Sequence, residues 1–152
     1  GLHDDVVFIG AGRLGLANRG LTAMALGADL VNVAREAMLA IGCIQSQRCH
    51  TGRCPTGVAT QNPRLERGLD PADKSVRCAY YVAALRQELL RLGRACGHRH
   101  PGLVGPDQVE YLSDGHESTD LAELCGYRPD WFRPGDAVLD ALDECWPAVA
   151  HR

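Results

Sequence analysis

The sequence has few aromatic residues, no long hydrophobic run and no excess of basic charge. Each of these absences argues against one kind of core or partner. Aromatic residues make up 5% of the 152 residues, so a hydrophobic core must rest on leucine, valine, alanine and isoleucine. No apolar run approaches the roughly 20 residues that a membrane-spanning helix needs, and we therefore expect no membrane partner. The net charge of −3 gives no indication of a nucleic acid partner.

Cysteine, in contrast, is abundant. The chain has seven cysteines, an odd number, and three of them fall within a dozen residues. No signal peptide precedes them, so a secreted protein held by disulfides is disfavoured and a reducing, cytoplasmic location is predicted. The length suits one domain, and the chain lacks an initial methionine and enters an apolar segment almost at once. These features predict the C-terminal part of a longer protein.

Three cysteines form the most informative motif. Cys43, Cys49 and Cys54 have the spacing C-x5-C-x4-C, and Pro55 follows the last of them. Thiolates are the preferred ligands of iron–sulfur clusters, and a short run of three closed by Cys-Pro can wrap a loop around one cluster. The spacing alone leaves two alternatives open, which are a zinc site with His50 as fourth ligand and a set of packed free thiols.

The segment before this motif has the pattern of parallel βα units. An apolar, β-branched run over residues 4–9 predicts a strand buried on both faces. A helix is predicted over residues 16–26, with Gly27 at its C-terminal cap, followed by a strand over 29–33 and a helix over 35–41. Two such units predict part of a parallel α/β fold.

The glycines after the first predicted strand admit three interpretations. Gly10, Gly12 and Gly15 match G-x-G-x-x-G, the fingerprint of a dinucleotide-binding Rossmann unit. The next strand ends in Ala34-Arg35 instead of the usual acidic residue, although an arginine there could accept a 2′-phosphate. The same glycines could form a phosphate site at the end of barrel strands, or only a tight turn.

The C-terminal half has the signals of helices. Asp70-Pro71 predicts the N-cap and first residue of a long helix that ends near residues 92–93, with its leucines and tyrosines in the core. Short helical pieces are predicted after Gly105-Pro106, and another helix over residues 137–145. Three aromatic residues are predicted to pack this tail on the rest: Trp131, Phe132 and Trp146.

Residues 6–70 resemble the FMN-binding glutamate synthase family. The likeness is most specific in the cysteine motif and its continuation Pro55-Thr56-Gly57-Val58-Ala59-Thr60-Gln61. For the fold, the resemblance implies an α/β protein in which residues 1–70 are the last two βα units of a (β/α)8 TIM-like barrel. The cysteine loop would span residues 43–54, and a mostly helical extension would span 71–152. The barrel would be incomplete within this chain.

The resemblance also implies cofactors and the residues that hold them. A three-iron four-sulfur (3Fe-4S) cluster would be ligated by Cys43, Cys49 and Cys54. The phosphate of FMN would be lined by Gly12, Arg13, Ala34 and Arg35. No catalytic residue is assigned within the chain.

The function implied is that of a piece of a glutamate-synthase-type oxidoreductase. That family makes L-glutamate from 2-oxoglutarate and ammonia, either free or derived from glutamine, and a ferredoxin or a reductase subunit donates the electrons. Because six barrel strands are missing here, we expect the isolated chain to be inactive. The glycines and the cysteines leave two alternatives, which are a nicotinamide-dependent Rossmann oxidoreductase and a zinc-bound structural or interaction module.

Overall fold

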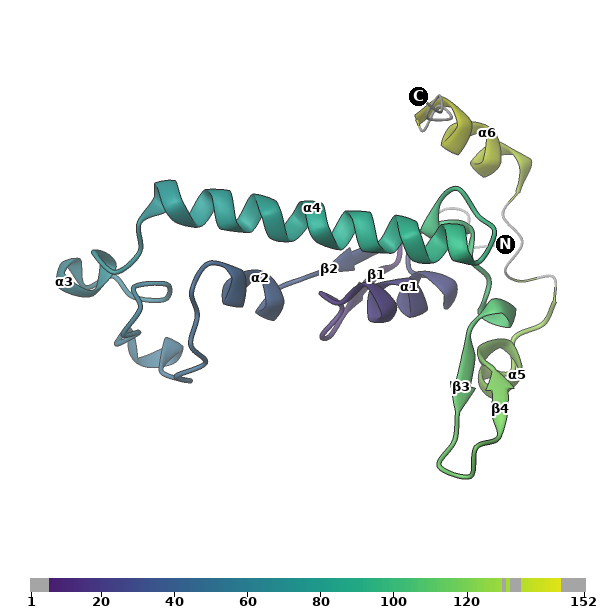
Figure 1. The fold of residues 1–152 in the computed structure, drawn as a ribbon, viewed down its shortest axis with the longest axis horizontal. Helices are drawn as coiled ribbons and strands as arrows, with labels where there is room; N and C mark the ends of the chain where they lie inside the picture. Colours follow the sequence, from purple (N-terminus) through teal and green to yellow (C-terminus); the bar gives the residue numbers. More distant parts are fainter. Residues whose placement is uncertain (1–5, 130, 132–134, 146–152) are drawn as a thin grey trace. The chain divides into compact units, whose positions relative to one another are not determined.

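The computed structural model describes residues 6–129, 131 and 135–145, and it shows a mixed α/β protein with two short sheets (Figure 1). The chain divides into two compact units, residues 1–104 and 105–152. No helix in the described ranges is long and apolar enough to span a membrane.

The first unit begins with two parallel strands and the helices that follow them. Their bounds are β1 (Ile9–Ala11), α1 (Ala17–Ala25), β2 (Leu30–Asn32) and α2 (Arg35–Ala40). In the sheet, Ile9 lies opposite Leu30 and Ala11 lies opposite Asn32. Helix α1 connects two parallel neighbours, as a βα unit requires. The predicted βα pattern is therefore confirmed, although both strands are shorter than expected.

The predicted burial of the first strand on both faces is wrong for this chain. Residues 1–5 lie outside the described part, and β1 starts only at Ile9. The side chains before and within it are exposed, at 66% for Val7, 52% for Phe8 and 63% for Ile9. Burial of a parallel strand needs neighbouring strands and helices on both sides, and the described sheet has only two strands.

The long helix α4 (Pro71–Ala95) is the main packing element of the first unit. It starts as predicted, because the Asp70 carboxylate accepts a hydrogen bond of 3.0 Å from the amide of Ala72. Figure 1 shows α4 running along α1 and α2, and it contacts both helices. The buried apolar side chains include Leu21 and Ala25 of α1 and Leu89 of α4. Near its end, α4 meets the short 3₁₀ turn η3 (Pro101–Leu103).

The chain between α2 and α4 is mostly irregular. It contains the 3₁₀ turn η2 (Cys49–Thr51) and the short helix α3 (Pro63–Glu66). The Asn62 side chain caps α3 by accepting a hydrogen bond of 2.9 Å from the amide of Arg64. All three cysteines of the motif lie in this connection.

The second unit contains a hairpin that the sequence analysis missed. Its elements are η4 (Pro106–Gln108), β3 (Glu110–Leu112), β4 (Ser118–Asp120), α5 (Leu121–Cys125) and α6 (Asp136–Cys145). Strands β3 and β4 pair antiparallel, where short helical pieces were expected. Asp114-Gly115 lies in the turn between them, which is a residue pair that favours reversal of the chain.

Two further predictions concern the C-terminal half. Residues 1–104 form one compact unit and residues 105–152 the other, and α4 packs on α1 and α2. The expected bounds, 1–70 for the barrel units and 71–152 for the helical extension, stay a prediction. Of the three aromatic residues expected to pack the tail, Phe132 and Trp146 lie outside the described residues. Trp131 is 57% exposed and meets Tyr127 edge-on, with their ring centroids 6.0 Å apart.

Candidate functional site

The residues predicted to hold a phosphate lie at one edge of the β1–β2 sheet. Gly12 and Arg13 follow the carboxyl end of β1, and Ala34 and Arg35 follow that of β2. Parallel strands present their carboxyl ends at the same edge, so the register brings both pairs to this edge. Ligands of open α/β sheets bind at such an edge, outside the carboxyl ends of the strands.

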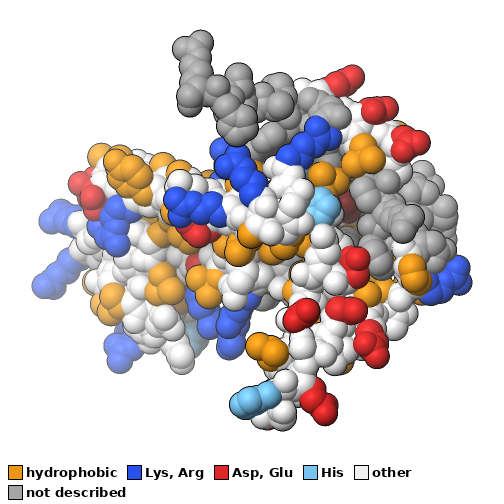
Figure 2. Space-filling view, turned by 45° about the vertical axis from the view of Figure 1, so that its right-hand side comes forward, with side chains coloured by type: hydrophobic (Ala, Val, Ile, Leu, Met, Phe, Trp, Pro, Cys, Tyr) orange, Lys and Arg blue, Asp and Glu red, His pale blue; other side chains and the backbone are white. Residues whose placement is uncertain are grey.

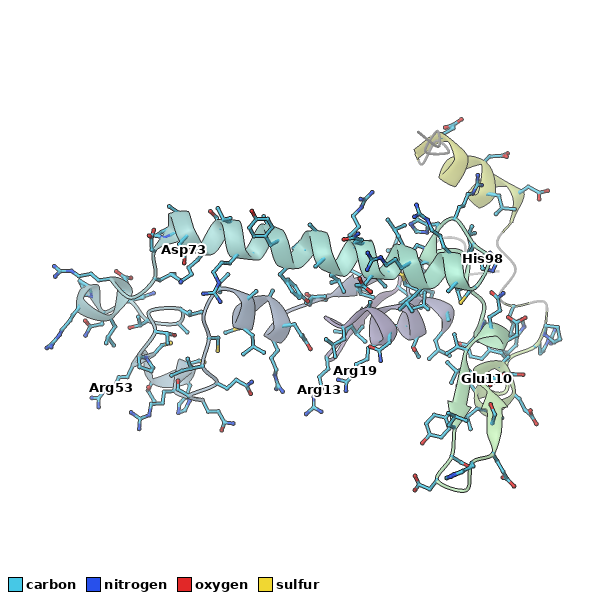
Figure 3. The ribbon with its side chains drawn as sticks, in the orientation of Figure 1. Arg13, Arg19, Arg53, Asp73, His98 and Glu110 are labelled. Atoms are coloured by element: carbon cyan, nitrogen blue, oxygen red, sulfur yellow. The ribbon has the colours of Figure 1, made fainter. Side chains whose placement is uncertain are left out.

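The glycine loop, residues 10–15, is open to solvent at Gly12. A Cβ built at Gly12 would have nothing within 4 Å, and the backbone there has φ +120°, which favours glycine. Arg13 is exposed, with φ 57°, and Figure 3 shows its side chain extending away from the ribbon. The loop therefore offers an accessible backbone and a guanidinium group to an anion.

The inner side of the same loop is closed by helices. A Cβ at Gly15 would lie 2.5 Å from the Glu36 Cβ and 2.5 Å from the Tyr81 hydroxyl. That hydroxyl donates a hydrogen bond of 2.8 Å to the carbonyl oxygen of Gly15. Burial, together with the nearby charge of Glu36, raises the pKa of Tyr81, so the hydroxyl stays a donor. The third glycine of the fingerprint thus serves helix packing.

The tyrosines of α4 were predicted to lie in the core, which is wrong for Tyr80, because its side chain is 72% exposed. Tyr81 was not distinguished from it. It lies one residue after the exposed Tyr80 on α4, and its partner is 66 residues away in the chain. Only the helical periodicity of the apolar face could have indicated that Tyr81 points inward while Tyr80 points outward.

The three cysteines occupy different environments. Cys43 is half-buried after α2, Cys49 is exposed at the start of η2, and Cys54 is only 4% exposed. The Cys54 sulfur lies 3.3 Å from the Thr56 hydroxyl. Hydrogen bonds from this hydroxyl and from the amides of Ala59, Thr56 and Val58 lower the pKa of Cys54 to about 7. At a pH near 7, about half of the Cys54 side chains are therefore in the thiolate form.

A close backbone contact holds the turn that follows Cys54. Gly57 has φ +80°, and a Cβ there would lie 2.7 Å from the Leu65 carbonyl oxygen and 2.9 Å from the Leu69 amide nitrogen. No larger residue fits between these backbone atoms. The Thr60 hydroxyl also donates a hydrogen bond of 2.5 Å to the Gly52 carbonyl oxygen. The second half of the cysteine loop is therefore fixed to α3 and to itself.

The donor chemistry of the loop fits an iron–sulfur centre. The lowered pKa of Cys54 favours the thiolate form that ligates metal. The Cys43 sulfur accepts a hydrogen bond of 3.4 Å from the amide of Gln45. Such N–H···S contacts are part of the environment that protein gives to a cluster. Among the residues that the structure describes, no three His, Cys, Asp or Glu side chains are gathered as a metal-binding group. Binding would therefore have to draw Cys49 and Cys43 toward Cys54, in the way that metal binding couples to local folding.

Comparison with known proteins gives one family match and several relatives. Residues 1–99 match a family described as the conserved region in glutamate synthase. The glutamate synthase large subunit-like protein YerD of Bacillus subtilis (strain 168) is 39% identical over 114 residues, which are 75% of this chain and 22% of that protein. The archaeal glutamate synthase (NADPH) of Methanocaldococcus jannaschii is 38% identical over 97 residues, which are 64% of this chain and 19% of that protein.

A longer match covers almost the whole chain. A glutamate synthase large subunit-like protein of Rhizobium meliloti (strain 1021) is 30% identical over an alignment 155 positions long, gaps included, which covers 91% of this chain and 34% of that protein. The chain spans about a fifth of the length of the first two relatives.

Proposed function

The chain belongs to the glutamate synthase family, and on this basis we propose that it is part of an iron–sulfur flavoprotein that makes L-glutamate from 2-oxoglutarate and ammonia. Within it, residues 1–70 are the last two βα units of an FMN-binding barrel, and the remaining residues extend it. The observation that carries the proposal is the Cys54 thiolate environment, which lies inside the matched residues 1–99.

The exposed strands support a barrel that the preceding segment completes. Ile9 and Leu30 face each other across the parallel pair, yet they are 63% and 55% exposed. Strands of parallel sheets are usually buried on both faces, so apolar residues at these positions indicate missing neighbours. Six further βα units, which we place upstream in the longer protein, would cover them.

The sheet edge supports a flavin phosphate site. Gly12 leaves the loop open, and Arg13 and Arg35 are exposed cations at the carboxyl ends of the two strands. In (β/α)8 barrels, phosphate sites commonly form in the loops after the last two strands. We assign Gly12, Arg13, Ala34 and Arg35 to this phosphate end.

The cysteine loop supports the cluster. Cys43, Cys49 and Cys54 would supply the three thiolates. The Thr56 hydroxyl, 3.3 Å from the Cys54 sulfur, would orient that sulfur before the cluster binds. When bound, the cluster and FMN would supply the electrons for converting 2-oxoglutarate and ammonia to L-glutamate. This chain contributes the ligands and the phosphate contacts, while substrate contacts come from the upstream segment. We expect the protein to act in the cytoplasm, and the 152 residues alone to be inactive.

The proposal is tested on the longer natural protein, prepared without oxygen and with its flavin content measured. A double substitution, Arg13→Gln with Arg35→Gln, is compared with the charge-matched Arg91→Gln with Arg94→Gln on α4. We expect the first variant to lose FMN by about tenfold or more in affinity and the second to retain it. Glutamate formation from 2-oxoglutarate and ammonia should fall with FMN content. Bound nicotinamide nucleotide without flavin would favour the Rossmann alternative, and zinc without iron would favour the structural module.

A further inference from the structure

We propose that the outward face of α4 pairs with the same face of a second copy of this chain, with the two helices antiparallel. We call this face the α4 seam, and it is defined by Asp73, Val76, Tyr80, Ala83, Leu90 and Arg94. Pairing concerns the assembly of the protein and needs neither the cluster nor the flavin, so it goes beyond the proposed function.

The α4 seam lies on the side of the helix that turns away from the rest of the first unit. On the inner side, the Tyr81 hydroxyl binds the Gly15 carbonyl oxygen and Leu89 is buried. Successive residues of an α-helix are about 100° apart, so Ala83 lies about 160° around the helix from Tyr81. Figure 1 shows α1 and α2 along one side of α4. The opposite side bears the seam, whose residues are all exposed except the half-buried Leu90.

The middle of the α4 seam is apolar and has the spacing of a helix pair. Val76, Ala83 and Leu90 are seven residues apart, and Tyr80 lies between the first two. Val76 is 50% exposed and Tyr80 is 72% exposed. Figure 2 shows hydrophobic side chains, in orange, at the surface of its upper left edge, where α4 begins. Apolar residues repeated every seven positions form the line along which two helices pack.

The two ends of the α4 seam carry opposite charges at similar distances from its centre. Asp73 precedes Ala83 by ten residues and Arg94 follows it by eleven, which correspond to about 15 Å and about 16.5 Å along the helix. In an antiparallel pair centred on Ala83, Asp73 of one copy therefore lies beside Arg94 of the other. Val76 and Leu90 each lie seven residues from Ala83, so they meet in the same way.

These charges favour the antiparallel arrangement over a parallel one. A parallel pair would bring the two Asp73 carboxylates together, and likewise the two Arg94 guanidinium groups. Antiparallel helices also place opposite ends of their dipoles side by side. Lys74 already binds one oxygen of Asp73 at 2.6 Å, but that side chain is 54% exposed, so a second cation can reach it. Exposed ion pairs are weak, and we expect a reversible dimer and not a permanent one.

The sizes of the central side chains also suit a close approach of two helices. Ala83 lies at the centre, and Ala79 and Ala84 beside it are exposed as well. The distance between packed helices depends on the side chains at their contact, so alanines here allow the backbones to come close. Tyr80 can then cover the alanines of the partner, and tyrosine is enriched at protein interfaces because it joins a large apolar ring to a polar tip.

A second copy fits this face better than the upstream segment of the longer protein. The α4 seam contains its own complement, since Asp73 meets Arg94 and Val76 meets Leu90 through a two-fold axis. The upstream segment of the proposed barrel is needed at the exposed strands β1 and β2, which lie outside this face. Coverage of the seam by that segment is the alternative that the experiment separates.

The test follows the association of the longer natural protein, with its cofactors bound, by sedimentation velocity over a range of protein concentrations. Tyr80→Glu is compared with Tyr111→Glu, which makes the same change at a 56% exposed tyrosine of the second unit. We expect a dimer whose dissociation constant rises about tenfold or more in the first variant and less than twofold in the control.

An exchange of charges tests the antiparallel arrangement itself. Asp73→Arg and Arg94→Asp should each weaken the dimer, because each variant places like charges together at both ends of the pair. When the two variants are mixed in equal amounts, every arginine faces an aspartate at these positions. The mixture should therefore recover most of the affinity that each variant has lost.

Three results would overturn the pairing of α4. They are an association state that Tyr80→Glu leaves unchanged, an equal loss in Tyr80→Glu and Tyr111→Glu, and a mixture of the charge variants that recovers no affinity. A lower thermal stability of Tyr80→Glu with unchanged association would assign the seam to the upstream segment. Iron and FMN contents of the same samples test the proposed function separately, because the α4 seam contains none of the residues assigned to either group.

Discussion

The Tyr81 hydroxyl donates a hydrogen bond of 2.8 Å to the carbonyl oxygen of Gly15 and so ties the long helix α4 to the glycine loop. We expect Tyr81→Phe to lower the free energy of unfolding by about 1 kcal/mol, because the Gly15 carbonyl loses a partly buried donor. Urea unfolding measures the change. Tyr80→Phe is the control, since Tyr80 is 72% exposed, and an equal loss in both variants would contradict the role of Tyr81.

Gly15 itself is predicted to accept no side chain. Gly15→Ala would bring a Cβ within 2.5 Å of Glu36 and of the Tyr81 hydroxyl, so α2 and α4 would have to move apart. Overpacking of this kind costs about 1–3 kcal/mol. Gly135→Ala is the control, because its Cβ would meet nothing within 4 Å. Thermal unfolding should show a large loss for the first variant and almost none for the second, and the reverse order would refute the packing role.

The sequence indicated local features better than distant ones. Asp70 and Pro71 predicted the start of α4 because a cap is formed by neighbouring residues, and the Asp70 carboxylate does accept the Ala72 amide. The strand around Phe8 was predicted to be buried from its apolar character alone. Its exposure depends on neighbours that the two-stranded sheet does not supply.

The cysteine loop shows a second limit of sequence reasoning. The spacing identified Cys43, Cys49 and Cys54 as candidate ligands, but the conformation between them could not be read from residue types. Gln45 and Gln47 adopt positive φ, which their side chains do not favour. Thr56, which lowers the pKa of Cys54 most, is recognisable only once the turn after Pro55 is folded.

The pKa of Cys54 predicts how its reactivity depends on pH. In the metal-free chain, iodoacetamide should modify Cys54 at a rate that rises through a midpoint at about pH 7, well below the ordinary thiol value of 9.0. Thr56→Val should move this midpoint upward, because the largest stabilising hydrogen bond is lost. Peptide mass spectrometry separates Cys54 from the other thiols. Thr51→Val is the control, since the Thr51 hydroxyl donates to the Arg48 carbonyl oxygen and not to Cys54.

The same pKa has a consequence for stability. The thiolate is favoured in the folded chain, so its contribution is fully present above the unfolded value of 9.0 and is lost as the pH falls through about 7. The metal-free protein should therefore be less stable at pH 6 than at pH 8, and Thr56→Val should reduce that difference. A difference unchanged by Thr56→Val would show that other groups cause it.

His100 predicts a second pH effect, of the same sign and at lower pH. Burial lowers its pKa below 6.5, and its Nδ1 accepts a hydrogen bond of 3.1 Å from the Gly102 amide. The contribution of neutral His100 is present above pH 6.5 and is lost as the pH falls through the lowered pKa, because the protonated Nδ1 cannot accept. We expect a loss below about 1 kcal/mol, since the ring is only partly buried. His100→Asn should flatten the profile between pH 5 and 7, and a profile that this substitution leaves unchanged would contradict the role of His100.

The exposed strand predicts a difference between this chain and a longer one. Ile9→Ser should change the unfolding free energy of the 152-residue chain by less than about 0.5 kcal/mol, because Ile9 is 63% exposed. In a protein that includes the upstream segment, the same substitution should cost about 2 kcal/mol or more, since new strands would bury the side chain. Equal effects in the two proteins would contradict the incomplete barrel.

The central claim is that the three cysteines hold an iron–sulfur cluster, and the most direct test is the iron, acid-labile sulfide and zinc content of anaerobically prepared chain. The account predicts about three irons per chain, lost in Cys49→Ser and kept in the control Cys125→Ser, whose sulfur is exposed and outside the loop. Cys54→Ser should lose them as well. Zinc in place of iron, no metal at all, or iron that survives Cys49→Ser would contradict the claim.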